Sequence, residues 1–264
     1  MLRRLFAMTS SSDLAPRLAW LLLPALLVLS QIASASHLML AVGEDRPPYI
    51  MAGGKRGLEL AVLKEAFAYK GHTFESFQVS SRRLNQVLIG DGTDAAAGVQ
   101  ESPNGAYYSL PFIAYRYVAL SKQKQQLTIN KMDELLAISV VTSQNTYQQL
   151  GVDFASLYAP ARRQNDPIPA RYLELPNPIQ AVKMFWQDRA DVIIIELNVF
   201  KALTSELDNN FNTSDALVVH PIFPAAAQFQ VSFKDEQLRN DFNAGLAILH
   251  SSGRYRELVS RYLK

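Results

Sequence analysis

After residue 36, short apolar runs of strand length alternate with segments of helical periodicity, and this alternation most limits the folds open to the chain. Residues 37–43, 74–79 and 191–196 have the character of strands. Between the first two, residues 57–70 carry apolar side chains at helical spacing and end before Gly71, a residue that commonly closes helices. This order predicts an α/β fold.

The alternation of strand-like and helical segments continues to the C-terminus. Asn177-Pro178 is a favourable N-cap and first-turn pair, and it predicts a helix that starts there. Gly253 separates two amphipathic helices at the end of the chain. Further strands are predicted at residues 94–99, 117–121, 137–142, 217–220 and 229–233, and a short helix at 82–89.

The first 35 residues have the pattern of a cleaved signal peptide. Basic residues at Arg3, Arg4 and Arg17 precede and flank an apolar segment at 20–29, and Ala33-Ser-Ala35 fits a cleavage site. The alternative is an uncleaved anchor, which the short apolar segment and its Pro24 disfavour. No later run has the length of a membrane helix. We therefore expect a mature chain that begins after residue 35 and has no membrane span.

Charge and cysteine content narrow the function classes. Three of the 26 basic and one of the 24 acidic residues lie in the first 35 residues, which leaves 23 of each. A balanced mature chain gives no reason to expect nucleic acid as a partner. The absence of cysteine excludes disulfides, thiolate zinc sites and a thiol nucleophile. We expect a monomer in the bacterial periplasm, without metal or cofactor.

Five segments carry a family resemblance. In their order and spacing they resemble the bacterial extracellular solute-binding proteins of family 3, the periplasmic receptors of polar amino acid ABC transporters, over nearly all of the mature chain. The segments are VGEDRPPY (42–49), GLELAVLKEAFAYKG (57–71), LIGDGTDAAAG (88–98), AVKMFWQDRADVIIIE (181–196) and FKDEQLRNDFNAGLAILHSSGRYRELVSRYL (233–263).

The resemblance implies the type II periplasmic-binding-protein fold, with two α/β lobes joined by two crossing segments. Lobe 1 would comprise residues 37–115 plus 226–264, and lobe 2 residues 116–225, with the hinge near 114–117 and 224–227. A small ligand would bind between the lobes. The protein would perform no chemistry itself and would deliver its ligand to an ABC permease or to a membrane sensor protein.

The resemblance also implies site residues. Tyr49 stands where the family has an aromatic residue that stacks on the ligand. Glu196, five positions after Asp191, stands where an acid takes the ligand's amino group. Independently, a carboxylate that ends an apolar run needs a cation or donors if it is buried. A Tyr that packs the lobe edge and a Glu in solvent are the structural alternatives.

Two further segments depart from the family pattern. At the helix start that would bind an anion, Thr142, Asn145 and Thr146 are present, but the usual glycine is missing. Helix capping is their other role. In residues 98–113 the arginine that clamps a carboxylate is absent.

No Lys or Arg occurs between Arg83 and Arg116, so three outcomes stay open. Arg116 or Arg83 supplies the cation, the ligand has no free carboxylate, or the cleft binds nothing tightly. Polar side chains of this segment would suit a neutral or cationic ligand, with Glu196 as the anionic partner. The candidates are Gln100, Ser102, Asn104, Tyr107 and Tyr108.

Two alternative functions follow. A sensory or interaction module would keep the fold and lose the pocket. An enzyme is the other alternative, because the same fold hosts a dehydratase in which a cleft carboxylate is the general acid. Glu196 would take that role, but the sequence offers no second titrating partner. The four histidines are scattered without metal-ligand spacing.

Overall fold

The computed structural model describes residues 35–84, 86–89, 92–158, 171–207, 211–223 and 226–263. The chain divides into two units, Met1–Ala35 and Ser36–Lys264, and every helix and strand named below belongs to the second. The predicted signal peptide lies, apart from Ala35, outside the described residues. Within those residues, no helix has both the length and the apolar character needed to cross a membrane.

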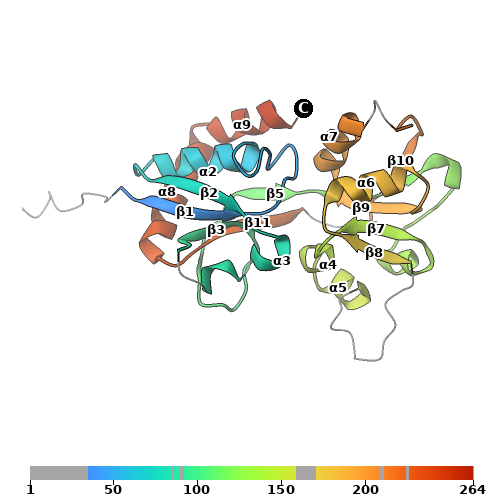
Figure 1. The fold of residues 1–264 in the computed structure, drawn as a ribbon, viewed down its shortest axis with the longest axis horizontal. Helices are drawn as coiled ribbons and strands as arrows, with labels where there is room; N and C mark the ends of the chain where they lie inside the picture. Colours follow the sequence, from blue (N-terminus) through green and yellow to red (C-terminus); the bar gives the residue numbers. More distant parts are fainter. Residues whose placement is uncertain are drawn as a thin grey trace, which may run out of the picture. The chain divides into compact units, whose positions relative to one another are not determined.

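The first sheet has the strand order β2-β1-β3-β11-β4, and β5 also pairs with β11. Figure 1 labels β1, β2, β3, β5 and β11 of this sheet. Strand β1 is parallel to β2 and β3, whereas β11 is antiparallel to β3, β4 and β5. Helix α2 packs against α8 and α9 in this lobe. The elements are β1 (His37–Val42), α2 (Leu58–Ala68), β2 (Thr73–Gln78), β3 (Ala95–Val99), β4 (Tyr107–Tyr108), β5 (Ile113–Tyr115), β11 (Ala227–Phe233), α8 (Glu236–Ser251) and α9 (Arg254–Tyr262).

The second sheet has the strand order β10-β6-β9-β7-β8. Strand β6 is antiparallel to β9 and β10, whereas β7 is parallel to β8 and β9. Helices α6 and α7 pack against β9. The elements are β6 (Tyr117–Lys122), β7 (Val140–Ser143), α4 (Thr146–Gln149), α5 (Val152–Tyr158), β8 (Tyr172–Leu175), α6 (Pro178–Trp186), β9 (Val192–Glu196), α7 (Leu197–Leu207) and β10 (Leu217–His220).

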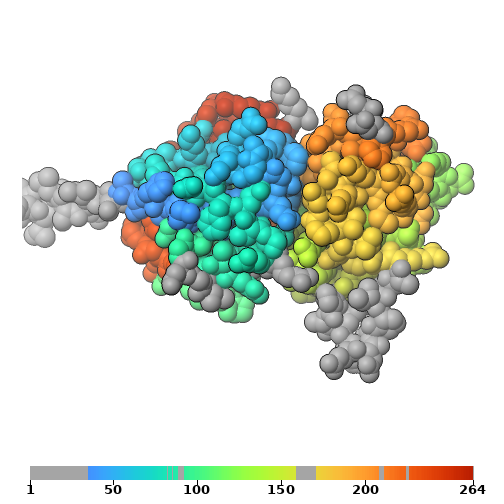
Figure 2. Space-filling view, in the orientation of Figure 1, coloured from blue at the N-terminus to red at the C-terminus, as the bar shows by residue number. Residues whose placement is uncertain are grey.

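The chain passes between the two sheets at β5 and β6. Only Arg116 separates β5, which pairs with β11 in the first sheet, from β6, which pairs with β9 in the second. The chain returns between β10 and β11, where residues 224 and 225 of the predicted hinge lie outside the described residues. The exact lobe boundaries and hinge positions stay predictions. On the face in Figure 2, the blue to blue-green surface of the lobe with the first sheet adjoins the yellow and orange surface of the lobe with the second sheet.

Most predicted elements are present, with one clear correction. The single helix expected at 82–89 is wrong: the structure has α3 (Ser81–Leu84) and a separate 3-10 turn at Val87–Ile89. A run this short forms few helical hydrogen bonds against the cost of starting a helix, so the two pieces do not merge. Helix α6 begins as predicted, and the side chain of Asn177 accepts a hydrogen bond from the Ile179 amide at 3.0 Å.

Candidate ligand-binding site

The loop between β1 and α2 is folded by its own backbone. The Arg46 amide donates to the Ile50 carbonyl at 2.8 Å, and the Ile50 amide donates back to the Arg46 carbonyl at 3.0 Å. The Asp45 carboxylate accepts from the Gly53 amide and from the Gln78 side chain. These bonds fix the directions in which Arg46 and Tyr49 leave the loop.

Gly57 lets helix α2 start against this loop. A Cβ at this position would lie 2.1 Å from the Tyr49 carbonyl oxygen, and its φ of 118° is one that glycine tolerates best. The close approach allows the Glu59 amide to donate to the Tyr49 carbonyl at 3.1 Å, so a loop carbonyl caps the helix. Glu59 is thereby placed beneath the loop that carries Arg46.

Glu59 is a fully buried acid, and only one of its two carboxylate oxygens is hydrogen-bonded within the part of the chain that the structure describes. Its side chain is 0% exposed, and Oε1 accepts a hydrogen bond from the Tyr115 hydroxyl. Oε2 has no hydrogen-bond partner among the described residues. Burial raises the pKa of the carboxyl, whereas Tyr115 and the charge of Arg46 lower it in part. A buried acceptor of this kind needs a donor.

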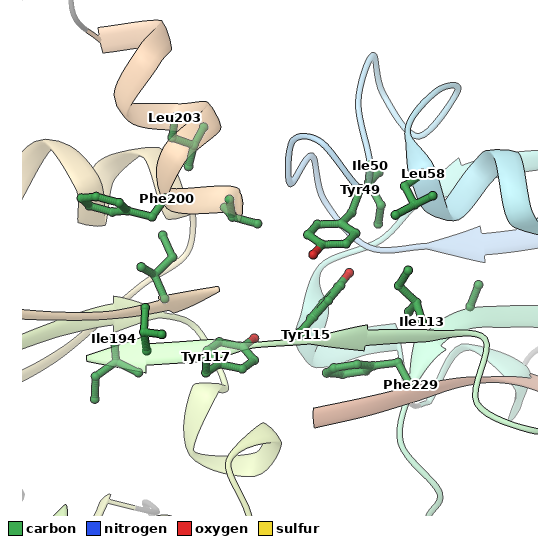
Figure 3. Packing of buried hydrophobic residues seen from close by; sticks show 14 of the residues in the cluster. Tyr49, Ile50, Leu58, Ile113, Tyr115, Tyr117, Ile194, Phe200, Leu203 and Phe229 are labelled. Carbon is green, nitrogen blue, oxygen red and sulfur yellow. The ribbon is translucent and has the colours of Figure 1, made fainter. Parts of the chain in front are cut away.

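Arg46 and Tyr115 complete what we call the Glu59 cluster (Arg46, Glu59 and Tyr115). The Arg46 guanidinium lies over the Tyr115 ring, 5.1 Å from its centroid. Burial opposes the charge, but Tyr115, Tyr117 and Glu59 together raise the pKa of Arg46 above its ordinary value. The Tyr115 ring also packs on Tyr49 at a centroid distance of 4.6 Å (Figure 3).

A cavity of about 40 Å³ adjoins the Glu59 cluster and is lined from both lobes. Gly98, with φ 79°, forms part of its wall, and a Cβ there would lie 3.4 Å from Glu59 Oε2. Lobe 1 contributes Gly43, Arg46, Ile50, Glu59, Ser81, Leu84, Ala97, Gly98, Val99, Gln100, Tyr115 and Phe229, and lobe 2 contributes Asn145, Gln148 and Gln149.

Tyr49, Glu196 and Asn198 form a second polar group, the Glu196 cluster. Glu196 is 2% exposed and ends β9 directly before α7. Its Oε2 accepts from the Val199 amide at 2.8 Å and its Oε1 from Asn198 Nδ2 at 3.0 Å. The carboxylate thus caps α7. Burial raises its pKa, and these hydrogen bonds offset part of the rise.

Asn198 also donates to the Tyr49 hydroxyl at 3.2 Å, which links the β1–α2 loop of lobe 1 to α7 of lobe 2. Tyr49 is 1% exposed, and burial together with the charge of Glu196 raises its pKa above the ordinary value. Neither Tyr49 nor Glu196 is among the described residues that line the cavity. The structure therefore brings these two predicted residues together, at a place beside the cavity.

The other predicted residues are divided between the cavity and its surroundings. Gln100 and Asn145 line the cavity. Ser102 and Tyr108 are hydrogen-bonded to each other at 3.0 Å, and the Tyr108 hydroxyl donates to Asn104. These bonds stay within the predicted segment, outside the cavity wall.

The predicted anion corner is occupied by internal hydrogen bonds. The Thr142 hydroxyl donates to the Ile194 carbonyl at 2.7 Å, and that of Thr146 to the Ser143 carbonyl at 2.6 Å. Both side chains are fully buried. Asn145 precedes α4 with φ 64°, and its backbone N–H donates to the Glu174 carboxylate at 3.0 Å. That amide has a protein carboxylate as its partner.

Arg116 and Arg83, the two cations considered from the sequence, are both exposed and do not line the cavity. The structure places Arg46 there instead, and sequence reasoning missed both Arg46 and Glu59. The available signals were an arginine directly before two prolines and a glutamate between two leucines in the first turn of a helix. No group of three His, Asp or Glu side chains suited to a metal ion is found in the ranges that the structure describes.

The chain matches no model of a known family and no curated protein sequence. Solved structures do match, and three of them each match over 86% of this chain at 17% identity. A histidine kinase sensor domain with similarity to periplasmic binding proteins is matched over 96% of its length with a TM-score of 0.68. A mutant of the arginine-binding protein ArgBP from T. maritima is matched over 94%, with a TM-score of 0.65.

The fold is that of the type II periplasmic binding proteins. This confirms the fold expected from the sequence, with two mixed sheets and their helices. Substrate-binding proteins of amino acid ABC transporters are among the structural neighbours. A further neighbour with the periplasmic-binding-protein fold is an ancestral amino-acid-binding protein described as a precursor of cyclohexadienyl dehydratase, with a TM-score of 0.65 and 95% of its chain covered.

Proposed function

We propose that this chain is an exported receptor that binds a small polar ligand, an amine or an amino-acid-like molecule, between its lobes. It would present the ligand to an ABC permease or to a membrane sensor protein. The observation that carries the proposal is Oε2 of Glu59, which has no hydrogen-bond partner among the residues that the structure describes and is fully buried at a cavity that both lobes line. Structural neighbours of both kinds, transporter receptors and a kinase sensor domain, support the two partner classes.

Glu59 defines the chemistry of one end of the ligand. A buried acceptor without a partner costs about 1–3 kcal/mol, and more when it is charged. An ammonium or other N–H donor on the ligand would remove that cost and gain a charge-assisted hydrogen bond. The amides of Gln100, Asn145 and Gln149 at the cavity suit further polar groups on the same ligand.

Binding would require the lobes to separate. A cavity of about 40 Å³ has room for a few water molecules only. A ligand the size of an amine or amino acid would therefore enter an open form, and closure would bring Asn145 and Gln149 towards Glu59. Hinge closure of this kind is common in two-lobe receptors.

The test is a thermal-shift screen of the purified protein against amines, amino acids, small peptides and organic acids, with titration calorimetry on each ligand that stabilises it. A ligand bound only to the folded state raises the Tm. Glu59→Gln should weaken binding by tenfold to about a hundredfold, because a charge-assisted hydrogen bond is lost. The matched control is Glu75→Gln in the same lobe, whose side chain is exposed and should leave binding unchanged.

A Tm that no member of the panel raises would count against the receptor. If Glu59→Gln leaves ligand binding unchanged, the receptor function still stands, but Glu59 does not contact the ligand. The two results are distinguishable because the first concerns the wild-type protein and the second the variant alone.

A second candidate is an interaction module that needs no ligand. The observation that favours it is the hydrogen bond from Asn198 to Tyr49, since side chains of the two lobes bond to each other directly. Small-angle scattering of the ligand-free protein distinguishes the candidates. A receptor should become more compact when ligand is added, whereas a ligand-free module should already be compact and should not change.

An enzyme that uses Glu196 as general acid has less support. Both carboxylate oxygens of Glu196 accept hydrogen bonds from its own helix segment, and the residue lies beside the cavity. If the chain were an enzyme of this kind, Glu196→Gln would abolish turnover and preserve binding of the substrate.

Export to the periplasm is part of the proposal and has its own test. The signal pattern of residues 1–35 supports it, together with a fold typical of periplasmic receptors. Mass spectrometry of protein recovered from the periplasm should find Ser36 as the first residue. Recovery of the uncleaved chain with the membrane fraction would overturn the cleaved signal.

A further inference from the structure

Arg46 is the single cation among the described residues that line the cavity. Its side chain is half-buried, and of the described carboxylates none lies within 4.0 Å of the guanidinium. The Tyr115 ring covers one face of it, at 5.1 Å from the centroid. Glu59 acts on it electrostatically, while the bonded oxygen of that carboxylate is held by the Tyr115 hydroxyl.

A guanidinium offers five N–H donors in a planar fork that matches a carboxylate bidentately. An aromatic face stabilises the charge but accepts few of these hydrogen bonds. The charge of Arg46 is thus compensated by the Tyr115 ring and by Glu59, but its guanidinium lacks a bidentate acceptor among the described residues. An anionic group in the cavity would supply one.

The loop holds Arg46 in position before any ligand arrives. Its backbone is bonded in both directions to Ile50, and Asp45 ties the same loop to Gly53 and Gln78. Preorganisation of this kind reduces the entropy lost on binding. Across the cavity, lobe 2 presents the neutral side chains of Asn145, Gln148 and Gln149, which add no competing charge.

We propose that Arg46 binds an anionic group of the ligand, a carboxylate, and so adds a second determinant of specificity beside Glu59 in the same cavity. The proposal rests on the proposed function, since it concerns the same cavity. It implies a ligand that carries both a donor for Glu59 and a carboxylate for Arg46. Ligands with the donor alone would leave the guanidinium without its acceptor and would bind more weakly.

Formate is the probe, because it is the smallest carboxylate. The ¹⁵N-labelled protein is titrated with sodium formate against sodium chloride at constant ionic strength, and the Arg46 Nε–Hε resonance is followed by NMR. We expect a saturable shift of that resonance in the wild type. Arg46→Lys keeps the positive charge but loses the planar guanidinium that can bind a carboxylate bidentately. In this variant the resonances of neighbouring backbone amides report formate binding, which should be at least tenfold weaker than in the wild type.

Arg46→Gln should abolish the saturable shifts of the neighbouring amides, whereas Arg116→Gln, at an exposed arginine, should leave them unchanged. Dispersed amide spectra establish that each variant folds, and Arg46→Lys decides the matter if Arg46→Gln does not fold. The absence of a saturable shift in the wild type would overturn the proposal. Equal formate binding to wild type and Arg46→Lys would overturn it as well.

The failure of this proposal differs from failure of the proposed function. If a panel ligand binds the wild type, its decarboxylated analogue should bind at least tenfold more weakly, and Arg46→Gln should remove that difference. If neither removal of the ligand's carboxylate nor Arg46→Gln changes the affinity, the proposed role of Arg46 is overturned, whereas the proposed receptor function still stands. If the protein binds formate at Arg46 but binds no ligand of the panel, the anion site is supported and the receptor function is contradicted.

Discussion

Glu59 and Glu196 are both buried near the junction of the lobes, and they differ in how many of their carboxylate oxygens accept a hydrogen bond. Glu196 has hydrogen-bond donors on both oxygens, while Glu59 has one on Oε1 and none on Oε2 among the described residues. Burial raises the pKa of both. Burial and a shifted pKa therefore do not by themselves distinguish a structural acid from one that is open to a ligand. The unpaired oxygen of Glu59 is the difference between them, and it is the acceptor that the proposed ligand would use.

The partners of the two acids explain the difference. Those of Glu196 are local, since Asn198 and Val199 follow it by two and three residues at the start of α7. Such a geometry is that of an N-cap and requires only the turn from β9 into the helix. Glu59 instead depends on Tyr115, 56 residues away. The Glu196 cluster is thus satisfied by its own segment, and the Glu59 cluster depends on tertiary structure.

The largest expected effect comes from Tyr115→Phe, which removes the one hydroxyl that is bonded to Glu59. Both oxygens of a buried carboxylate would then lack a donor, which we expect to cost about 1–3 kcal/mol in the free energy of unfolding. Urea denaturation followed by circular dichroism measures it. Tyr107→Phe, at an exposed tyrosine, is the control. A loss below about 0.5 kcal/mol, the usual range of surface substitutions, would show that Glu59 finds another donor.

Glu196→Ala should have the next largest effect. It removes the cap of α7 and a bond to Asn198, and loss of an N-cap typically costs about 0.5–2 kcal/mol. Glu206→Ala tests the same substitution at an exposed position of the same helix and should change the free energy of unfolding little. If ligand affinity fell sharply while stability stayed constant, Glu196 would be a ligand anchor, and the contrast with Glu59 would fail.

The pH dependence of stability sharpens the comparison further. The pKa of Glu59 is raised above the ordinary 4.5 in the folded protein, so the folded state binds this proton more tightly than the unfolded state does. The resulting stability is fully present below the ordinary pKa and is lost as pH rises through the folded value. The free energy of unfolding should therefore fall with rising pH in this window, by at most about 1.4 kcal/mol per pH unit for one group.

Glu59→Gln removes that contribution, so its free energy of unfolding should fall less steeply from pH 4.5 upward than that of the wild type. Urea titrations at a series of pH values measure the two slopes. Glu75→Gln should run parallel to the wild type. Parallel profiles for wild type and Glu59→Gln would mean that Glu59 has the same proton affinity in both states and is not held in the environment described here.

Local sequence patterns, such as apolar spacing and helix caps, predicted most helices and strands. The remaining short strands depend on pairing with strands that are distant in the sequence. The two C-terminal helices and the start of α6 follow from apolar spacing and caps within each segment. Strands β4 and β5 have only two and three residues, and they exist because β11 offers hydrogen bonds. No local pattern specifies such pairing.

The site follows the same rule. The family pattern pointed to Tyr49 and Glu196, and the structure brings them together through Asn198. Glu59 escaped notice because a glutamate in the first turn of a helix is ordinarily a solvated, dipole-compensating residue. Its burial results from the close approach that Gly57 permits and from the partner Tyr115, neither of which is visible along the chain.

The smallest expected effect belongs to Arg116→Gln, at the cation that the sequence suggested as a replacement clamp. The Arg116 side chain is exposed and does not line the cavity, so the free energy of unfolding should change by less than about 0.5 kcal/mol. Formate titration and urea denaturation of the same sample test both expectations. Because Arg116 separates β5 from β6, a loss of ligand affinity without loss of formate binding would mean that it acts through lobe closure, and the cation that contacts ligand would still be Arg46.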